Sequence, residues 1–150
     1  MKILFIEDNK TKAEDIKNFV FQNFAFAEII IKESFTAGLR ELFTNEYDIL
    51  FLDMSLPTRE GVSSSSINNF EQLGGHKILS EMKRKNNSTP TVVISMFSEF
   101  GVGESFMDLR ELHDMFEVKF GGFYKGFVFY SARQEENWKR DLRNVLQKLL

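Results

Sequence analysis

Three acidic residues directly follow two short hydrophobic runs, and carboxylates placed in this way could bind a cation. Residues 2–6 (KILFI) lead into Glu7 and Asp8, and residues 48–52 (DILFL) lead into Asp53. Short hydrophobic runs that are bounded by polar residues are typical of strands buried on both faces. If the two strands are neighbours in a parallel sheet, the three carboxylates converge at the edge where ligands bind. Because like charges repel, this cluster needs a cation to be stable.

The hydrophobic pattern predicts that strands and helices alternate along the chain and so position these acids. The expected strands are residues 2–6, 28–32, 48–52, 91–95 and 123–130. The expected helices are residues 9–23, 34–44, 71–85, 107–116 and 131–149. Ser34 is expected to cap the second helix, and Ser131 with Gln134 to form a capping box at the last helix. Five strands alternating with five helices predict an α/β fold, with a parallel sheet covered by helices on both faces.

The composition indicates a globular domain and excludes several classes of protein. A length of 150 residues, with 43% hydrophobic and 27% charged residues, suits one domain. A net charge of -3 gives no electrostatic case for a nucleic-acid partner, and no cysteine is present for disulfides or thiolate metal sites. The hydrophobic stretch at the N-terminus is too short for a signal peptide or a membrane span. We therefore expect a cytoplasmic protein without a membrane partner.

The order of these residues resembles the receiver domain of two-component response regulators, over nearly the whole chain. The residues that carry the match are Glu7 and Asp8 after the first strand, Asp53 after the third, Pro57 four residues later, Ser95 at the end of the fourth strand and Lys125 in the fifth. The resemblance to this CheY-like family implies a flavodoxin-like, doubly wound sheet of five parallel strands in the order 2-1-3-4-5. It also implies one receiver-like domain over residues 1–150.

The resemblance implies a role for each residue of the motif. Asp53 would accept a phosphoryl group, and Ser95 and Lys125 would contact the oxygens of that group. Mg²⁺ would be held by Glu7, Asp8, Asp53 and the carbonyl of Ser55. A histidine kinase or a phosphotransfer protein would donate the group, and an unknown downstream protein would respond to it. The chain would be a signalling switch, not a metabolic enzyme, with only self-catalysed phosphotransfer and autodephosphorylation.

Three features depart from the family pattern. A polar insertion at about 58–69 lengthens the region after the phosphoacceptor, and an extended segment at about 98–115 lengthens the region before the fifth strand. Gly126 follows Lys125 where the family has a proline, so a permissive residue replaces a rigid one. Phe123 lies two residues before Lys125, where the family's switch aromatic lies three before its lysine, so Lys119 is an alternative candidate for the lysine that contacts the phosphoryl group.

Other functions fit the same residues less well. A pseudo-receiver would use the fold as a phosphorylation-independent interaction or dimerisation module, which the insertions favour and the three acids oppose. A flavodoxin-like cofactor binder would need a phosphate-binding loop where Glu7 and Asp8 stand. A magnesium-dependent phosphohydrolase or a Toprim-like nuclease would need a second acid two residues after Asp53. Ser95 also has an alternative role, in which its hydroxyl hydrogen-bonds to the backbone of its own loop. If the chain forms a homodimer, we expect the last helix and the fifth strand to make the interface.

Overall fold

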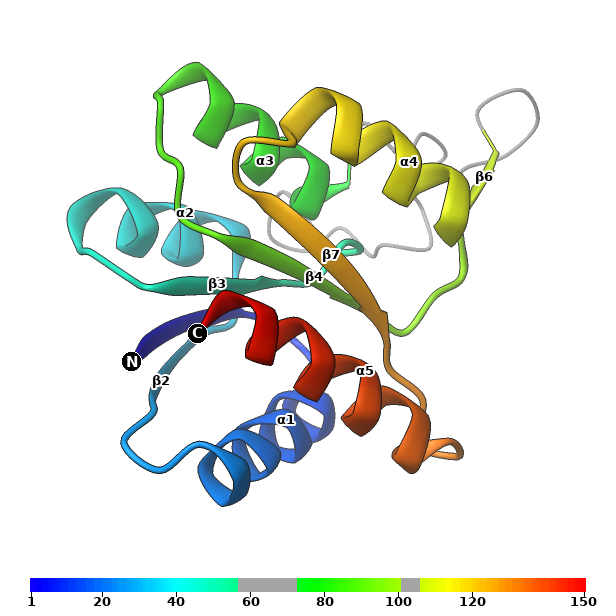
Figure 1. Ribbon diagram of the computed structural model, residues 1–150. Helices are drawn as coiled ribbons and strands as arrows, with labels where there is room; N and C mark the ends of the chain where they lie inside the picture. The colour runs from blue at the N-terminus through cyan, green and yellow to red at the C-terminus, as the bar shows by residue number, and fades with distance from the viewer. Residues whose placement is uncertain (57–72, 101–105) are drawn as a thin grey trace.

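The computed structural model describes residues 1–56, 73–100 and 106–150 of the chain. Five parallel strands form one sheet in the order β2-β1-β3-β4-β7 (Figure 1). These strands are β1 (Lys2–Ile6), β2 (Glu28–Lys32), β3 (Ile49–Leu52), β4 (Thr91–Ser95) and β7 (Tyr124–Phe129). The predicted α/β fold and strand order are confirmed, because β7 is the fifth strand that the sequence predicts. Pro57 and the predicted insertion at 58–69 lie outside the described residues.

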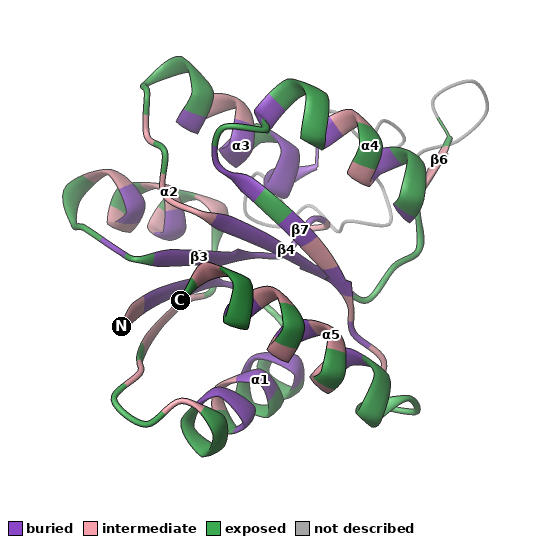
Figure 2. Ribbon diagram, in the orientation of Figure 1, coloured by how far each residue is buried: buried purple, intermediate pink, exposed green. Residues whose placement is uncertain are grey.

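Two layers of helices cover the sheet, one on each face (Figure 1). One layer consists of α1 (Lys10–Asn23) and α5 (Glu135–Leu149). The other layer consists of α2 (Phe35–Thr44), α3 (Gly74–Arg84) and α4 (Leu109–Phe120). The central strands are buried between the layers, whereas the outer faces of the helices are exposed (Figure 2). Two hydrophobic cores result, because each face of the sheet packs against its own helices.

The predicted helix starts are partly borne out. Ser34 caps α2, since its Oγ accepts a hydrogen bond from the Ala37 amide at 3.1 Å. The predicted capping box at the last helix is wrong. Residues 132–133 form a turn, and α5 begins after Gln134, whose side chain makes no capping hydrogen bond to the helix backbone and instead accepts one from Asn137 Nδ2 at 3.3 Å.

A short pair of antiparallel strands separates β4 from α4. Strand β5 (Glu99–Phe100) pairs with β6 (Met107–Asp108). The helix predicted at 107–116 therefore begins two residues later, and Asp108 caps it by accepting a hydrogen bond from the Glu111 amide at 2.8 Å. In the part that the structure describes, the predicted extended segment at 98–115 contains this strand pair and the start of α4.

A β-bulge interrupts the pairing between β7 and β4. Thr91 pairs with Tyr124, whereas Val92 pairs with Gly126, so Lys125 is the additional residue on β7. Gly126 has a φ of 142°, a conformation that residues with a side chain rarely adopt. Gly126 therefore enables the bulge.

The start of α3 packs closely against the chain that follows β3. A Cβ atom on Gly75 would lie 2.6 Å from Met54 Cα and 2.7 Å from the Asp53 carbonyl oxygen. Two backbone hydrogen bonds hold the same contact: the Gly74 amide donates to the Leu56 carbonyl at 2.8 Å, and the Gly75 amide donates to the Met54 carbonyl at 3.2 Å. Only glycine permits this approach, which fixes the backbone directly after Asp53.

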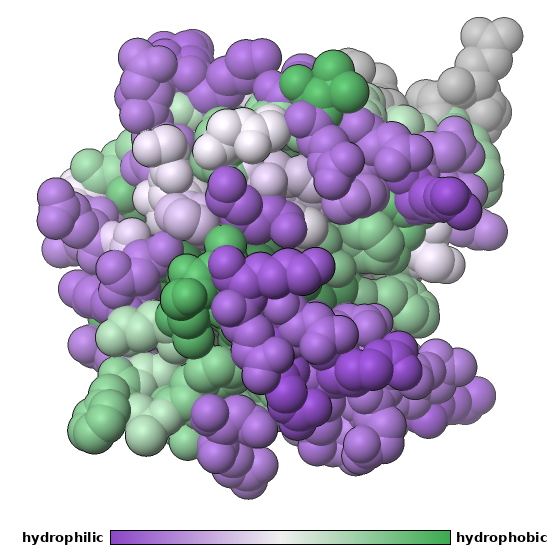
Figure 3. All heavy atoms as spheres, in the orientation of Figure 1, coloured by the Kyte–Doolittle hydropathy of each residue, from purple (hydrophilic) through white to green (hydrophobic). Residues whose placement is uncertain are grey.

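The outer surface over α5 is mostly hydrophilic (Figure 3). Hydrophobic atoms gather beside the C-terminal end of this helix, where Leu150 is exposed. Across the residues that the structure describes, no helix is both long enough and apolar enough to cross a membrane.

Candidate functional site

The three acids predicted from the sequence meet at the carboxyl end of the sheet. Strands β1 and β3 are parallel neighbours with Ile6 opposite Leu52, so the residues that follow them lie side by side. A carboxylate oxygen from each of Glu7, Asp8 and Asp53 lies within 4.8 Å of the others. Glu7 and Asp53 are buried, with 2% and 3% of their surface exposed, whereas Asp8 is exposed. The cluster is therefore buried on one side and open to solvent on the other.

The ammonium group of Lys12 lies inside this acid cluster. Lys12 Nζ is 2.6 Å from Glu7 Oε2 and 3.1 Å from Asp53 Oδ1, and it donates a hydrogen bond to the Ile94 carbonyl at 2.6 Å. The lysine is 1% exposed. Three oxygen partners satisfy all three donors of the ammonium, as a buried charge requires. Lys12 thus joins the ends of β1, β3 and β4.

The sequence analysis missed Lys12, although the helical pattern contains a signal for it. Residues spaced four and seven apart lie on one face of a helix, and Lys12, Ile16 and Phe19 have this spacing and are all buried. A lysine is disfavoured in the first turn of a helix by the helix dipole. A lysine on the inward face of that turn, next to two acids, therefore indicates a specific buried partner.

The buried acids remain electrostatically unbalanced despite Lys12. Burial raises the pKa of Glu7 to about 7; the adjacent ammonium of Lys12 opposes this rise, and repulsion from Asp53 adds to it. Burial, and then repulsion from Asp53, also raises the pKa of Asp8. Desolvation therefore outweighs the ion pair with Lys12 at Glu7, and the charge of Asp53 opposes that ion pair further.

The donor set fits a hard divalent cation. Carboxylate oxygens are the ligands that Mg²⁺ prefers, and the exposed Asp8 leaves the cluster open to the waters that Mg²⁺ keeps. A cation bound here would share Glu7 and Asp53 with the Lys12 ammonium. The negative excess of the cluster favours such a second cation.

Two serines flank the acids, in different arrangements. The Ser55 hydroxyl lies 3.4 Å from Asp53 Oδ1, at the long end of hydrogen-bonding distance. Ser95 ends β4, next to β3, and is buried. Its Oγ donates to the Phe97 carbonyl at 2.8 Å and accepts from the Phe97 amide at 3.0 Å. Ser95 therefore adopts the alternative that the sequence left open, a bond to its own loop.

Solved structures that resemble the chain come from response regulators. The receiver domain of the Francisella response regulator 1452 has a TM-score of 0.63 at 16% identity, over 99% of this chain and 98% of that one. RcsB from Salmonella enterica, in a structure bound to promoter rprA with phosphomimetic BeF3-, has a TM-score of 0.67 at 17% identity over the same shares. TrrA from Thermotoga maritima, in complex with Mg(2+)-BeF, has a TM-score of 0.60 at 18% identity, also over 99% and 98%. The fold is that of a receiver domain.

Curated relatives match this receiver-like chain over almost its full length. The Detocs response regulatory protein DtcB of Enterobacter cloacae is 29% identical over 153 residues, which cover 99% of this chain and 100% of that protein. DtcB of Vibrio alginolyticus is 22% identical over 149 residues, 97% of this chain and 99% of that protein. No family model matches the chain. The resemblance to response regulator receivers is therefore confirmed by relatives and by the fold.

The lysine predicted to contact the phosphoryl group is not at the acid end of this receiver fold. Ser95 pairs with Phe129 at the carboxyl end of the sheet, whereas Lys125 lies next to Thr91 at the opposite end. Four residues of extended strand, about 13 Å, separate Lys125 from Phe129. Lys125 is also exposed. The prediction for Lys125 is wrong, because a lysine in the β-bulge at the amino end cannot reach Asp53.

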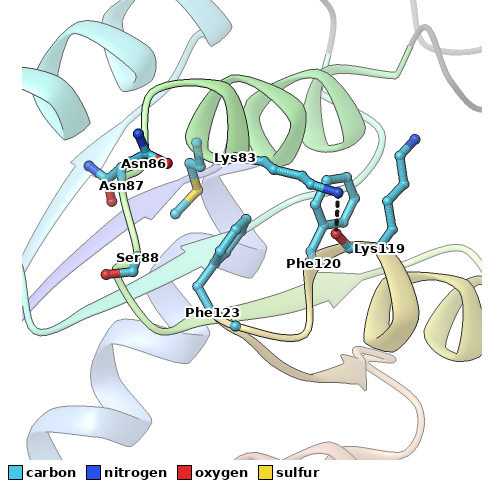
Figure 4. Close-up of a pocket in the computed structure, with 9 residues that line it drawn as sticks. Lys83, Asn86, Asn87, Ser88, Lys119, Phe120 and Phe123 are labelled. Carbon is cyan, nitrogen blue, oxygen red and sulfur yellow. Dashed lines mark hydrogen bonds between the residues drawn. The ribbon is translucent and has the colours of Figure 1, made fainter.

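The alternative candidate, Lys119, makes a different set of contacts. Its Nζ lies 3.3 Å from His76 Nε2, and its carbonyl accepts a hydrogen bond from Lys83 Nζ at 3.0 Å. It lines a pocket of about 360 Å³ between the ends of α3 and α4, together with Phe120 and Phe123 (Figure 4). Among the described residues, no ion pair joins Lys119 to the three acids. Neither lysine that the sequence singled out contacts the acid cluster, whereas Lys12 does.

Proposed function

We propose that this chain is a two-component receiver that accepts a phosphoryl group on Asp53. One observation carries the proposal: Asp53 ends β3 with the carboxylates of Glu7 and Asp8 within 4.8 Å, at the carboxyl end of a receiver fold. Ser95 ends β4, the strand that pairs with β3. The names of the curated relatives support the same function.

The side chains divide the work of phosphoryl transfer between them. Glu7, Asp8 and Asp53, with the carbonyl of Ser55, would hold Mg²⁺, which supplies charge neutralisation for the phosphoryl oxygens when bound. Asp53 is the nucleophile, and its carboxylate forms the acyl phosphate. Ser95 leaves its own loop and donates its hydroxyl hydrogen to a phosphoryl oxygen. That change alters the conformation of the connection between β4 and α4. A partner protein can then distinguish the phosphorylated form from the unphosphorylated form by this surface.

The partners and the place of action follow from this role. A histidine kinase or a phosphotransfer protein donates the group, and a downstream protein reads the phosphorylated surface. Catalysis is limited to the receiver's own phosphorylation and dephosphorylation. We place this exchange in the cytoplasm, where such kinases present their phosphohistidine.

The test is the intact mass of the protein after incubation with a small acyl-phosphate donor and Mg²⁺. The wild type should gain one phosphoryl group, and Asp53→Asn should gain none. The matched control is Asp48→Asn, an acid directly before the amino end of the same strand that accepts a hydrogen bond from the Lys2 amide at 2.7 Å. This control should be phosphorylated like the wild type. An adduct of equal size on Asp53→Asn would contradict the proposal.

A pseudo-receiver is the second candidate, and the contacts of Lys12 favour it. The ammonium of Lys12 already lies in the acid cluster and pairs with Glu7 and Asp53, so a side chain of the protein supplies the positive charge that Mg²⁺ would otherwise supply. In this case the wild type would gain no phosphoryl group from a small donor or from a kinase, and titration calorimetry would detect no Mg²⁺ binding. Mg²⁺ binding with phosphorylation of Asp53 would exclude the pseudo-receiver.

A further inference from the structure

We propose that Lys12, on α1, is the lysine that contacts the phosphoryl group in this protein, in place of a lysine on the last strand. The inference rests on the proposed function and adds a residue to it. The family pattern places this lysine in the fifth strand, but the only lysine of β7 is Lys125, which lies at the wrong end of the sheet. Among the residues that the structure describes, the ion pairs of Glu7 and Asp53 are both with Lys12.

The local structure of α1 directs Lys12 into the site. Asn9 caps the helix, and its Oδ1 accepts a hydrogen bond from the Lys12 amide at 2.9 Å. The Asn9 amide in turn donates to Glu7 Oε1 at 3.1 Å. This cap fixes the first turn of α1 against the end of β1, so the Lys12 side chain points along the carboxyl edge of the sheet. Its Nζ ends 3.1 Å from Asp53 Oδ1.

Other cations do not compete for this role in the described ranges 1–56, 73–100 and 106–150. Within them, the ion pairs made by Glu7 and Asp53 are both to Lys12. The remaining ion pairs involve Lys32, Arg84, His113, Lys139 and Arg140, each with an acid outside the cluster. Lys12 is therefore the cation that is already beside the nucleophile.

The chemistry of the transfer gives Lys12 a direct task. A carboxylate oxygen of Asp53 forms a bond to phosphorus while the N–P bond of a phosphohistidine donor breaks. The electron pair of that bond stays on the imidazole nitrogen, which takes up a proton from water. The new phosphoryl oxygens carry more negative charge than the carboxylate oxygen that Lys12 faced before. Lysine is a compact charge on a flexible stem, so Nζ can turn from Asp53 Oδ1 to a phosphoryl oxygen without leaving the pocket.

The experiment compares Lys12→Met with Lys125→Met. Methionine has a similar unbranched stem but no charge, so both variants remove one ammonium and little volume. Phosphorylation is followed by intact mass with a small acyl-phosphate donor at saturating Mg²⁺. We expect Lys12→Met to be slower by at least about tenfold, as for loss of one charged donor to the reacting group. Lys125→Met should react within about twofold of the wild type, because an exposed lysine at the amino end contributes little.

Mg²⁺ binding separates a direct role from a structural one. Removing Lys12 frees Glu7 and Asp53, so calorimetry should find Mg²⁺ affinity in Lys12→Met equal to or above that of the wild type. Slow phosphorylation despite full Mg²⁺ binding supports contact with the phosphoryl group. A rate restored to the wild-type value at saturating Mg²⁺ would mean that Lys12 only balances charge, and this would overturn the inference.

A charge-matched background keeps the test valid if Lys12→Met does not fold. The pair to compare is then Glu7→Gln with Glu7→Gln/Lys12→Met, since the double variant loses one charge of each sign. The same rate ratio is expected. The measurement on the wild type tests the proposed function itself. If the wild type gains no phosphoryl group from the small donor or from a kinase, both the receiver function and the role of Lys12 are contradicted. An equally fast adduct on the wild type and on the Lys12 variants overturns only the role of Lys12.

Discussion

Lys12, on α1, and Lys125, in β7, lie at opposite ends of the central sheet. At the carboxyl end, Lys12 is buried and bonded to two carboxylates and a carbonyl. At the amino end, Lys125 is exposed in a β-bulge. The lysine in the expected strand thus makes no contact with the acid cluster, whereas the lysine on α1 does. Whether a lysine can take part in the acid site is decided by the end of the sheet at which it lies, more than by its position along the sequence relative to the other motif residues.

The largest expected difference between the two ends is in stability. Lys12→Met leaves Glu7 and Asp53 buried without their counter-charge, and breaking a buried ion pair in this way costs about 3 kcal/mol of unfolding free energy. Lys125→Met should change it by less than about 0.5 kcal/mol, as is usual for an exposed residue. Urea unfolding at neutral pH measures both values. Equal stability of the two variants would show that the charges of the pocket do not need Lys12.

The backbone glycines sharpen the same comparison. Gly75→Ala would force a Cβ to within 2.6 Å of Met54 Cα at the carboxyl end, and we expect a loss of about 1–3 kcal/mol from overpacking. Phosphorylation of Asp53 should slow as well, because its carbonyl is 2.7 Å from the same Cβ position. Gly122→Ala at the amino end is the control, since its Cβ would meet nothing within 4 Å. Thermal melting and intact mass test the pair, and an unaffected Gly75→Ala protein would contradict the close packing.

The smallest effect concerns the tyrosines near the two ends of β7 and appears only in alkali. Burial raises the pKa of Tyr124 at the amino end. Burial, with a hydrogen bond from the hydroxyl to Asp15 Oδ2, raises that of Tyr130 at the carboxyl end. Both should stay protonated in the folded protein at pH values where an unfolded tyrosine ionises.

The sign of the tyrosine effect follows from these raised pKa values. The neutral tyrosines stabilise the fold fully below pH 10, the ordinary value. This contribution falls as the pH rises from there towards the pKa of the folded state, because only the unfolded chain ionises. Ultraviolet absorbance should therefore show tyrosinate from these two residues only as the protein unfolds. Tyrosinate that forms in the folded protein near pH 10 would contradict their burial.

Much of the acid site could be predicted from the sequence, because the information was local. The hydrophobic runs before Glu7 and Asp53 predict strands, and parallel neighbours bring their carboxyl ends together at the same edge. The strand order came from the family resemblance, since spacing alone does not specify which strands pair. Ser34 was predictable for the same local reason, as a cap depends on residues within one turn.

The lysines could not be assigned in this way. Lys125 is the second residue of β7 and so lies at the amino end of the sheet, whereas the acids follow the carboxyl ends of their strands; the bulge accounts for only one of the four residues between Lys125 and Phe129. Lys12 was missed for a different reason. A lysine among polar neighbours in a first helical turn is usually exposed, and its burial follows from acids on two other strands.

The backbone hydrogen bond between Leu56 and Gly74 has a consequence for protein engineering. The Leu56 carbonyl and the Gly74 amide are bonded at 2.8 Å, so the stretch of chain between them begins and ends at one fixed point beside Asp53. The entropy cost of joining two fixed points of a chain rises only slowly with the number of residues between them. An epitope inserted between residues 57 and 72 should therefore leave the hydrogen bond between Leu56 and Gly74 in place, and with it the backbone that follows Asp53.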